Sequence, residues 1–456
     1  MGSFQNKATL SLTISMGGLA TGFTGGILVP ATYFSNIIYE MPNGYQEGTR
    51  VSVISTLYGS IGGAIFTGIL MNFLGRKLML NGLVMPYVIG WLSILAFEIP
   101  QMIYFGRALI GLSMGGFSVI SPIYLSEMAE VWCRGSMVFV FTLLVRVGFF
   151  FGFILTMWQG STRMELMSVL LFISTTILFL PGFFIPESPM VLILQKKESE
   201  AIEVLKSIRN SDYDIDRELD DIKLQVEGLK HGSLYFASSL KRRGTKRALL
   251  TMIILCFVQQ STFISAYMFW ASESGMIIAL EHNFFWFAVM VQILVQMIGV
   301  FSSLITIDSS GRRTLLLISA ALVMISTMGL AIRILYYDDQ WLQNINQVDI
   351  IFTTSATIMH SVGLTTIPWL LTTEMYTPDI KWLGGVISAV FAWSRRLAVS
   401  EFLYFYDKEM VFRVNVVLAS ISAAIGILVA FFLVIETRNR KMGEIHEILN
   451  GGRIEK

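Results

Sequence analysis

The sequence predicts an all-α membrane protein: twelve transmembrane helices as two pseudo-symmetric six-helix bundles with a cytosolic helical linker. The 456 residues are 54% hydrophobic and only 14% charged, whereas a soluble domain has about 25% charged residues. The charged turn Gly75-Arg76-Lys77 recurs as Gly311-Arg312-Arg313 about half a chain further on. One long polar stretch separates the two copies. An apolar chain that repeats its charged turns in order is expected to be two homologous membrane halves.

The apolar stretches define the expected elements. A helix needs about 20 apolar residues to cross the hydrocarbon core of a bilayer. Stretches of this kind are residues 8–34, 51–73, 78–97, 101–125, 136–159, 166–185, 247–275, 283–307, 314–336, 348–375, 383–406 and 411–434. They divide the chain into an N-terminal bundle (1–188), a linker (189–246), a C-terminal bundle (247–436) and a tail (437–456).

Basic residues predict the orientation of the chain. With both termini in the cytosol, about 24 of the 33 Lys and Arg residues fall on the cytosolic side, as the positive-inside rule requires. The linker pattern indicates short amphipathic helices, for example with Ala201, Leu205 and Ile208 on one face. Two interpretations of the linker stay open: a tether between the bundles, or a platform packed beneath both.

The chain carries an ordered set of short motifs: Gly75-Arg76-Lys77, Gly106-Arg107, Pro122 to Glu127 with Arg134-Gly135, Pro186-Glu187-Ser188-Pro189, Gln259-Gln260, Asp308 with Gly311-Arg312-Arg313, Pro368-Trp369 with Glu374, Trp393 and Glu436-Thr437. This set resembles the motifs of the sugar porter family of the major facilitator superfamily, and among its members those of the insect facilitated trehalose transporters and the animal facilitative glucose transporters. The resemblance implies facilitative (uniport) transport of sugars, trehalose or hexose, by alternating access. It further implies a monomer in the cell membrane with no cofactor, whose partners are a small-molecule sugar and the lipid bilayer, with no nucleic acid.

The repeated charged turns indicate a gate at the cytosolic ends of the helices. Isolated exposed ion pairs contribute only about 0–1 kcal/mol, and solvated helix ends are the simpler interpretation of a single pair. Here an acid-and-base set appears in both halves, so we expect the basic side chains to reach acids of the opposite half when the cytosolic side closes. The expected gating residues are Arg76, Lys77, Glu127, Arg134, Glu187, Arg312, Arg313, Glu374, Lys381 and Glu436.

Two residues depart from the family pattern at this gate. Met190 stands where the family usually has Arg, and Ile435 stands where it has Pro. One cytosolic ion-pair partner is therefore missing. We expect a less stable cytosol-closed state than in related proteins.

The resemblance places the sugar site at the midplane between the halves. The residues that it implies for substrate binding are Thr24, Thr142, Gln259, Gln260, Ser265, Gln296, His360, Ser361, Trp369 and Trp393. The site has few amides, since Ala392 stands where an Asn is typical. Thr24 stands where proton-coupled members carry an Asp. Because a threonine holds no titrating charge, this route of proton coupling is absent and facilitative transport is favoured.

Arginines inside the spans are the unusual feature of the chain, because charges there are costly and usually functional. Arg107 belongs to a family motif, and Arg395 also lies within a span. Arg146 and Arg396 each follow a site position by four residues, so we expect both to face the cavity and to contact substrate.

Several interpretations of these arginines remain. They pair with Glu401, Glu273 or carbonyl groups, or the substrate is an anionic, acid-bearing sugar-like solute, or the protein is a non-transporting sugar sensor. An enzyme is not expected, since the sequence shows no metal-ligand cluster and no Walker loop.

Overall fold

The computed structural model describes residues 2–28, 45–96, 99–159, 180–210, 213–227, 239–262, 282–336, 347–406 and 408–451. Within these ranges every regular element is helical and none is a strand. The helical segments that are long and apolar enough to cross a membrane are Arg50–Leu74, Arg76–Ala96, Pro100–Met128, Arg134–Leu155, Met290–Ser310, Arg312–Tyr336 and Arg413–Phe432. The total of twelve spans stays a prediction, because the stretch 166–185 lies largely outside the described residues.

Helices of the N-terminal half follow the apolar stretches closely. They are α1 (Gly2–Ile14), α2 (Met16–Leu28), α4 (Tyr45–Leu74), α5 (Arg76–Gly82), α6 (Val84–Ala96), α7 (Pro100–Met128) and α8 (Arg134–Gln159), followed by a 3-10 turn, η3 (Leu180–Phe183). The charged turn at Gly75 separates α4 from α5, because Gly75 adopts a φ of 84° that only glycine tolerates easily.

The C-terminal half repeats this order with one difference from the expected spans. Its helices are α14 (Arg243–Thr262), α17 (His282–Ser310), α18 (Arg312–Tyr336), α19 (Gln347–Val362), α20 (Ile367–Glu374), α21 (Lys381–Phe405) and α22 (Lys408–Phe432). The prediction of one continuous span over 348–375 is wrong, since the helix breaks between α19 and α20. Pro368, which lacks an N–H, is the second residue of α20, and in the break the amide of Thr365 donates to the carbonyl of His360 at 2.9 Å.

Small residues set how closely the helices pack. A β-carbon added to Gly63 on α4 would lie 1.9 Å from the carbonyl oxygen of Leu112 on α7, and one added to Gly22 on α2 would lie 1.8 Å from the carbonyl oxygen of Val145 on α8. Backbones therefore touch directly at both contacts, as is usual for helices packed in membranes. The α2–α8 contact fixes the rotation of α8, and Arg146 follows Val145.

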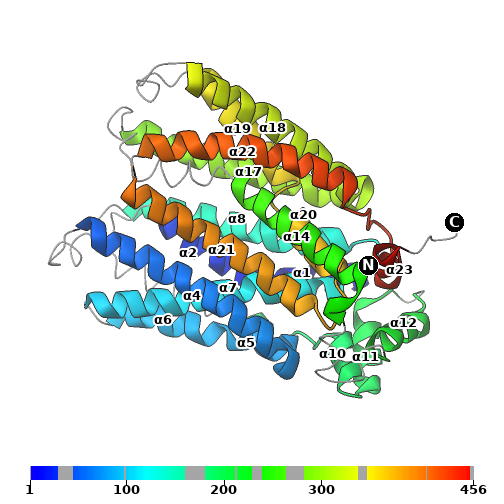
Figure 1. Ribbon diagram of the computed structural model, residues 1–456. Coiled ribbons are helices and arrows are strands. Elements are labelled where there is room, and N and C mark those ends of the chain that lie inside the picture. Colours follow the sequence, from blue (N-terminus) through cyan, green and yellow to red (C-terminus); the bar gives the residue numbers. More distant parts are fainter. Residues whose placement is uncertain are drawn as a thin grey trace.

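Four short helices gather at one end of the long helices: α10 (Pro189–Leu194), α11 (Glu198–Ile208), α12 (Ile215–Glu227) and α23 (Met442–Asn450), with both chain ends nearby (Figure 1). We call this end the linker side and the other end the opposite side. α12 lies between the N-terminal half and the tail. Arg209, just before it, donates to the carbonyl of Met128 at 2.9 Å, while Asp221 on α12 pairs with Lys441.

The Arg209 anchor is electrostatically stable. Burial alone would lower the pKa of its guanidinium, but the hydrogen bonds and charge of Glu218 outweigh burial and raise that pKa above its ordinary value. The Nη2–Oε1 distance of this pair is 2.6 Å. The linker helices thus contact the N-terminal half and the tail, and their packing beneath both bundles stays a prediction.

Candidate functional site

The first copy of the charged turn is held within the N-terminal half. Arg76 donates to Glu127 through Nε and Nη2, at 3.0 and 2.9 Å. Glu187 does not meet a basic side chain but accepts from the backbone amides of Arg76, Lys77 and Ser188, at 3.0, 3.1 and 2.8 Å. The amides of Arg76 and Lys77 open α5, so the carboxylate caps a helix N-terminus, where its negative charge is favourable.

The second copy repeats these contacts in the C-terminal half. Arg312 donates to Glu374 at 3.2 Å, and Glu436 accepts from the backbone amides of Arg312 and Arg313 at 3.0 and 3.1 Å. Thr437 donates to Glu374 at 2.6 Å, as Ser188 does to Glu127 at 2.6 Å in the first copy. The two copies of the sequence motif therefore form the same set of hydrogen bonds, each within its own half.

This geometry corrects one expectation. Arg76 and Arg312 were expected to reach acids of the opposite half, but each pairs with an acid of its own half. Arg313 donates to the carbonyls of Ala430 and Phe431, also in its own half. The reason is that each glycine turn folds its guanidinium back under the preceding helix, where Arg76 also contacts the carbonyl of Met71 at 3.4 Å.

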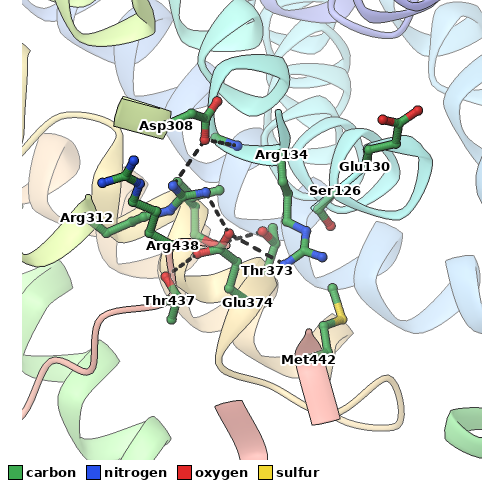
Figure 2. Close-up of polar contacts among 12 residues, drawn as sticks. Ser126, Glu130, Arg134, Asp308, Arg312, Thr373, Glu374, Thr437, Arg438 and Met442 are labelled. Atoms are coloured by element: carbon green, nitrogen blue, oxygen red, sulfur yellow. Dashed lines mark hydrogen bonds and ion pairs between the residues drawn. The ribbon is translucent and has the colours of Figure 1, made fainter. Parts of the chain in front are cut away.

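Contacts between the halves on the linker side come from other residues (Figure 2). Arg134 on α8 lies 3.7 Å from Glu374 on α20, Nη1 to Oε1. Asp308, at the end of α17, accepts from the backbone amides of Gly135 and Ser136 at 3.2 and 2.8 Å and so caps α8 from the other half. Asp308 belongs to one of the sequence motifs but was not among the expected gating residues.

The contacts between the halves on the linker side are asymmetric. The counterpart of Asp308 in the first copy is Asn72, whose amide donates to Gly68 of its own helix at 3.3 Å. Lys381, the counterpart of Arg134, is 1% exposed, and Nζ has Met442 Sδ as its neighbour at 3.7 Å. No described carboxylate forms an ion pair with Lys381. The cross-half bond expected of Lys381 is therefore not made here, although Arg134 makes its own.

A cavity of about 650 Å³ lies beside Lys381 on the linker side. Glu127, Met190, Asp221 and Lys441 are among the residues that line it, so it is bounded by the gate, α12 and the tail. Met190 is the residue that replaces the arginine expected from the family pattern. We call this space the linker-side cavity.

A second bond between the halves closes the opposite side. Arg50 Nη2 on α4 lies 2.6 Å from Glu401 Oε2 on α21. The guanidinium also lies 4.4 and 4.8 Å from the ring centroids of Tyr404 and Phe405. Glu401 was considered as a partner for the arginines of the spans, but here it binds Arg50. This contact was missed because nothing local in the sequence relates the two residues.

The central cavity lies between these two closures and has a volume of about 110 Å³. Both halves of the chain line it. The predicted substrate-binding residues that line it are Thr142, Arg146, Gln259, Gln260, His360, Trp369, Trp393 and Arg396. Thr21, Ser118, Phe141 and Thr365 also line it and were not predicted. Trp393 Nε1 donates to Ser118 Oγ of the other half at 3.3 Å, which closes the cavity between α7 and α21.

Other predicted site residues do not line this cavity. Thr24 is buried, and its hydroxyl lies 2.6 Å from Tyr87 Oη. Ser361 donates to the carbonyl of Thr357 at 2.8 Å, and Gln296 is 4% exposed. Ser265 and Glu273 lie outside the described residues.

Two cavity residues are held by the helix break. Gln259 Nε2 donates to the carbonyl of Thr365 at 2.5 Å, a carbonyl in the break between α19 and α20. His360 Nε2 donates to the carbonyl of Gln259 at 3.1 Å, and Nδ1 shares a hydrogen bond of 2.9 Å with Thr365 Oγ1. Protein groups thus engage both ring nitrogens of His360, whereas the side chain of Gln260 is less constrained, with one bond of 3.4 Å to Gln259.

A many-helix membrane bundle whose halves enclose a polar cavity, and meet on both sides of it, is the architecture of a membrane transporter of the major facilitator superfamily. The chain belongs to the sugar porter family within that class. The family model described as "Sugar (and other) transporter" matches residues 8–449. The protein is therefore a multi-pass transporter of the family that carries sugars, and it is not an enzyme.

Relatives of the chain agree with this assignment. It is 27% identical over 442 residues to the sugar transporter ERD6 of Arabidopsis thaliana, covering 95% of this chain and 85% of the relative. It is 25% identical over 455 residues to the facilitated trehalose transporter Tret1 of Bombyx mori, covering 97% and 86%.

Solved structures share the fold. The proton:xylose symporter XylE bound to 6-bromo-6-deoxy-D-glucose matches with a TM-score of 0.79 at 18% identity, covering 97% of this chain and 99% of that chain. The inward open conformation of the xylose transporter XylE from E. coli matches with a TM-score of 0.69 at 17% identity, covering 97% and 99%.

Proposed function

We propose that the protein is a facilitative uniporter that moves a sugar, trehalose or hexose, across the cell membrane by alternating access. The observation that carries the proposal is a central cavity with bonds between the halves on both of its sides. Arg134–Glu374 and the Asp308 cap lie on the linker side, and Arg50–Glu401 lies on the opposite side. Breaking one set while the other holds opens the cavity to one side only.

Uniport rather than proton symport is supported by the residue at the position of the proton-coupling acid. Thr24 occupies the position where the family resemblance expects an Asp in proton-coupled members. Its hydroxyl is engaged by Tyr87 and by the carbonyl of Ala20 at 3.1 Å. A hydroxyl does not titrate in the working pH range, so it cannot couple sugar movement to a proton gradient.

The proposed orientation places the linker side and both termini in the cytosol. Most of the basic residues then lie on that side, as the positive-inside rule requires. In this orientation the Arg134–Glu374 contact and the Asp308 cap belong to the cytosolic gate. Arg50–Glu401 belongs to the outer gate, and the proposed functional unit is a monomer.

Transport into proteoliposomes tests the proposal. Labelled trehalose and glucose are supplied to vesicles that hold the purified chain, with and without an imposed pH gradient. We expect uptake that stops at equal concentrations and is unchanged by the pH gradient. Uphill accumulation that follows the protons would overturn uniport, and saturable binding without uptake would indicate a sensor.

A matched pair of tryptophan variants on α21 locates the site. Trp393→Phe loses the bond to Ser118 in the cavity, whereas Trp382→Phe loses a bond of 2.9 Å to the carbonyl of Asp379 at the linker-side end of the helix. We expect KM for sugar to rise several-fold in the first variant only. Equal effects of the two variants would place the sugar elsewhere.

A further inference from the structure

Two arginines from different halves of the chain face the central cavity. Arg146 lies about 18 Å along α8 from its linker-side end, and Arg396 lies about 22 Å along α21 from its own. Both are therefore far from either membrane surface, beyond the reach of a side chain that extends to water. Both line the cavity, and the charge of Arg396 acts electrostatically on Arg146.

The side chain of Arg396 faces the cavity and is not buried between helices. It is exposed to solvent-accessible space although it belongs to the middle of a membrane helix. Its guanidinium carbon lies 4.6 Å from the ring centroid of Trp393, which the other half holds through Ser118. A cation stacked on an aromatic face keeps the N–H groups at its edge available for hydrogen bonds.

The neighbouring charges do not neutralise Arg396. Arg395 turns to the other face of α21, where it donates to Asn415 on α22. Glu401 is bound to Arg50. The described residues that line the cavity include no Asp or Glu, and no described carboxylate forms an ion pair with Arg396.

Two like charges that line one cavity in the middle of a membrane bundle repel each other, so the site favours a ligand that brings negative charge. A neutral sugar offers only hydroxyl groups. A carboxylate accepts two parallel N–H bonds from one guanidinium and is also attracted by a second. The remaining lining suits a sugar ring, since Trp369 and Trp393 provide aromatic faces and Gln260 and Thr142 provide polar groups.

We infer that the central site, besides neutral sugars, accepts an acid-bearing monosaccharide, such as a uronic acid, and binds it in preference to them, with its carboxylate between Arg146 and Arg396 and its ring against Trp393. This inference rests on the proposed transport function for its route across the membrane, but it concerns the binding site alone. Uniport of such a substrate moves one negative charge. Accumulation should therefore change about tenfold for every ~59 mV of membrane potential, whereas neutral sugar uptake should not respond.

Binding to the purified chain in lipid nanodiscs tests the inference independently of transport. Glucuronate and glucose are compared by calorimetry with the native chain, Arg396→Gln and Arg395→Gln. We expect the native chain to bind glucuronate at least tenfold more tightly than glucose. Arg396→Gln should lose that preference while still binding glucose, and Arg395→Gln should behave like the native chain.

Several results would overturn the inference: equal or tighter binding of glucose by the native chain, no glucuronate binding at millimolar concentration, or equal losses for both sugars in Arg396→Gln. If Arg396→Gln does not fold, Arg396→Lys is the second variant. Lysine keeps the positive charge but cannot donate two parallel hydrogen bonds to a carboxylate, so this variant should retain only part of the preference for glucuronate over glucose. Tight glucuronate binding without uptake would leave this inference standing and contradict the proposed transport function. Uptake of glucose, together with no effect of glucuronate, would leave the proposed transport function standing and contradict this inference.

Discussion

Asp308 is the residue whose removal should test the gate most directly. Its carboxylate caps α8 from the other half through the amides of Gly135 and Ser136, and it also lies 3.1 Å from Arg312 of its own half. Because the Asp308–Arg312 contact lies within one half, we expect it in both states of the gate, and its loss then cancels in the gating equilibrium. The cap of α8 exists only when the halves meet.

The expected change in the free energy of gate closure depends on which hydrogen bonds asparagine can still accept. Asp308→Asn keeps one acceptor oxygen for one amide and loses one charge-assisted bond, a class of bond with a net value of about 1.5–3 kcal/mol. Part of that value returns when water solvates the freed amide in the open gate. A loss of about 1.4 kcal/mol remains and shifts the closed-to-open ratio about tenfold towards the linker-side-open state.

Distance measurements by pulsed electron paramagnetic resonance can read this shift. Spin labels at Leu78 and Ser310, both exposed and on different halves, report separation of the linker-side ends. We expect Asp308→Asn to increase the population at long distances. Arg313→Gln, on the same turn but bonded within its own half, is the control and should leave the distribution unchanged. An unchanged distribution in Asp308→Asn, or an equal shift in both variants, would refute the assignment of the gate to contacts between the halves.

Three further predictions follow from other parts of the molecule. Gly311→Ala places a β-carbon 2.6 Å from a carboxylate oxygen at a φ of 89°, so we expect a loss of about 1–3 kcal/mol in thermal unfolding, whereas Gly82→Ala, which meets nothing within 4 Å, should be neutral. Arg50→Gln removes the bond to Glu401, which is partly exposed, and should shift the equilibrium by about 1 kcal/mol towards the state open on the opposite side, measured with labels on that side. Burial and the nearby charge of Lys381 lower the pKa of His446 to about 4. Because the pKa in the folded state lies below the ordinary value, we expect α23 to be fully docked above about pH 6.5. Its docking should weaken as the pH falls towards 4. Hydrogen exchange of α23, corrected for intrinsic rates, should show this loss, and a pH-independent exchange pattern would contradict it.

Comparison of sequence with structure shows which inferences are local. The helices and the charged turns were predictable, because apolar length and a glycine between charged residues are properties of short segments. The family was predictable for the same reason. The break between α19 and α20 was missed although Pro368 was visible, because a proline in a membrane helix also occurs without a break when neighbouring groups satisfy the backbone.

Partners across the bundle were less predictable. Arg76 and Arg312 were assigned to the opposite half, but the direction of a long side chain depends on how its turn folds under the preceding helix. The bond between Arg50 and Glu401 joins residues far apart in sequence without any shared motif. By contrast, the four-residue spacing of Arg146 and Arg396 from site positions was enough to predict that both face the cavity, since helical periodicity is local.

The linker-side cavity also offers a place, separate from the sugar site, where a small molecule could act on the gate. Because Lys381 forms no ion pair with a described carboxylate and Met190 takes the place of an arginine, the ion pair between the halves beside this cavity is Arg134–Glu374 alone among the described residues. A small molecule that fills the 650 Å³ beside Lys381 would add contacts in the closed state and none in the open state. We expect such a compound to act as a non-competitive inhibitor, lowering the maximal rate at every sugar concentration. A purely competitive pattern would show that it binds elsewhere.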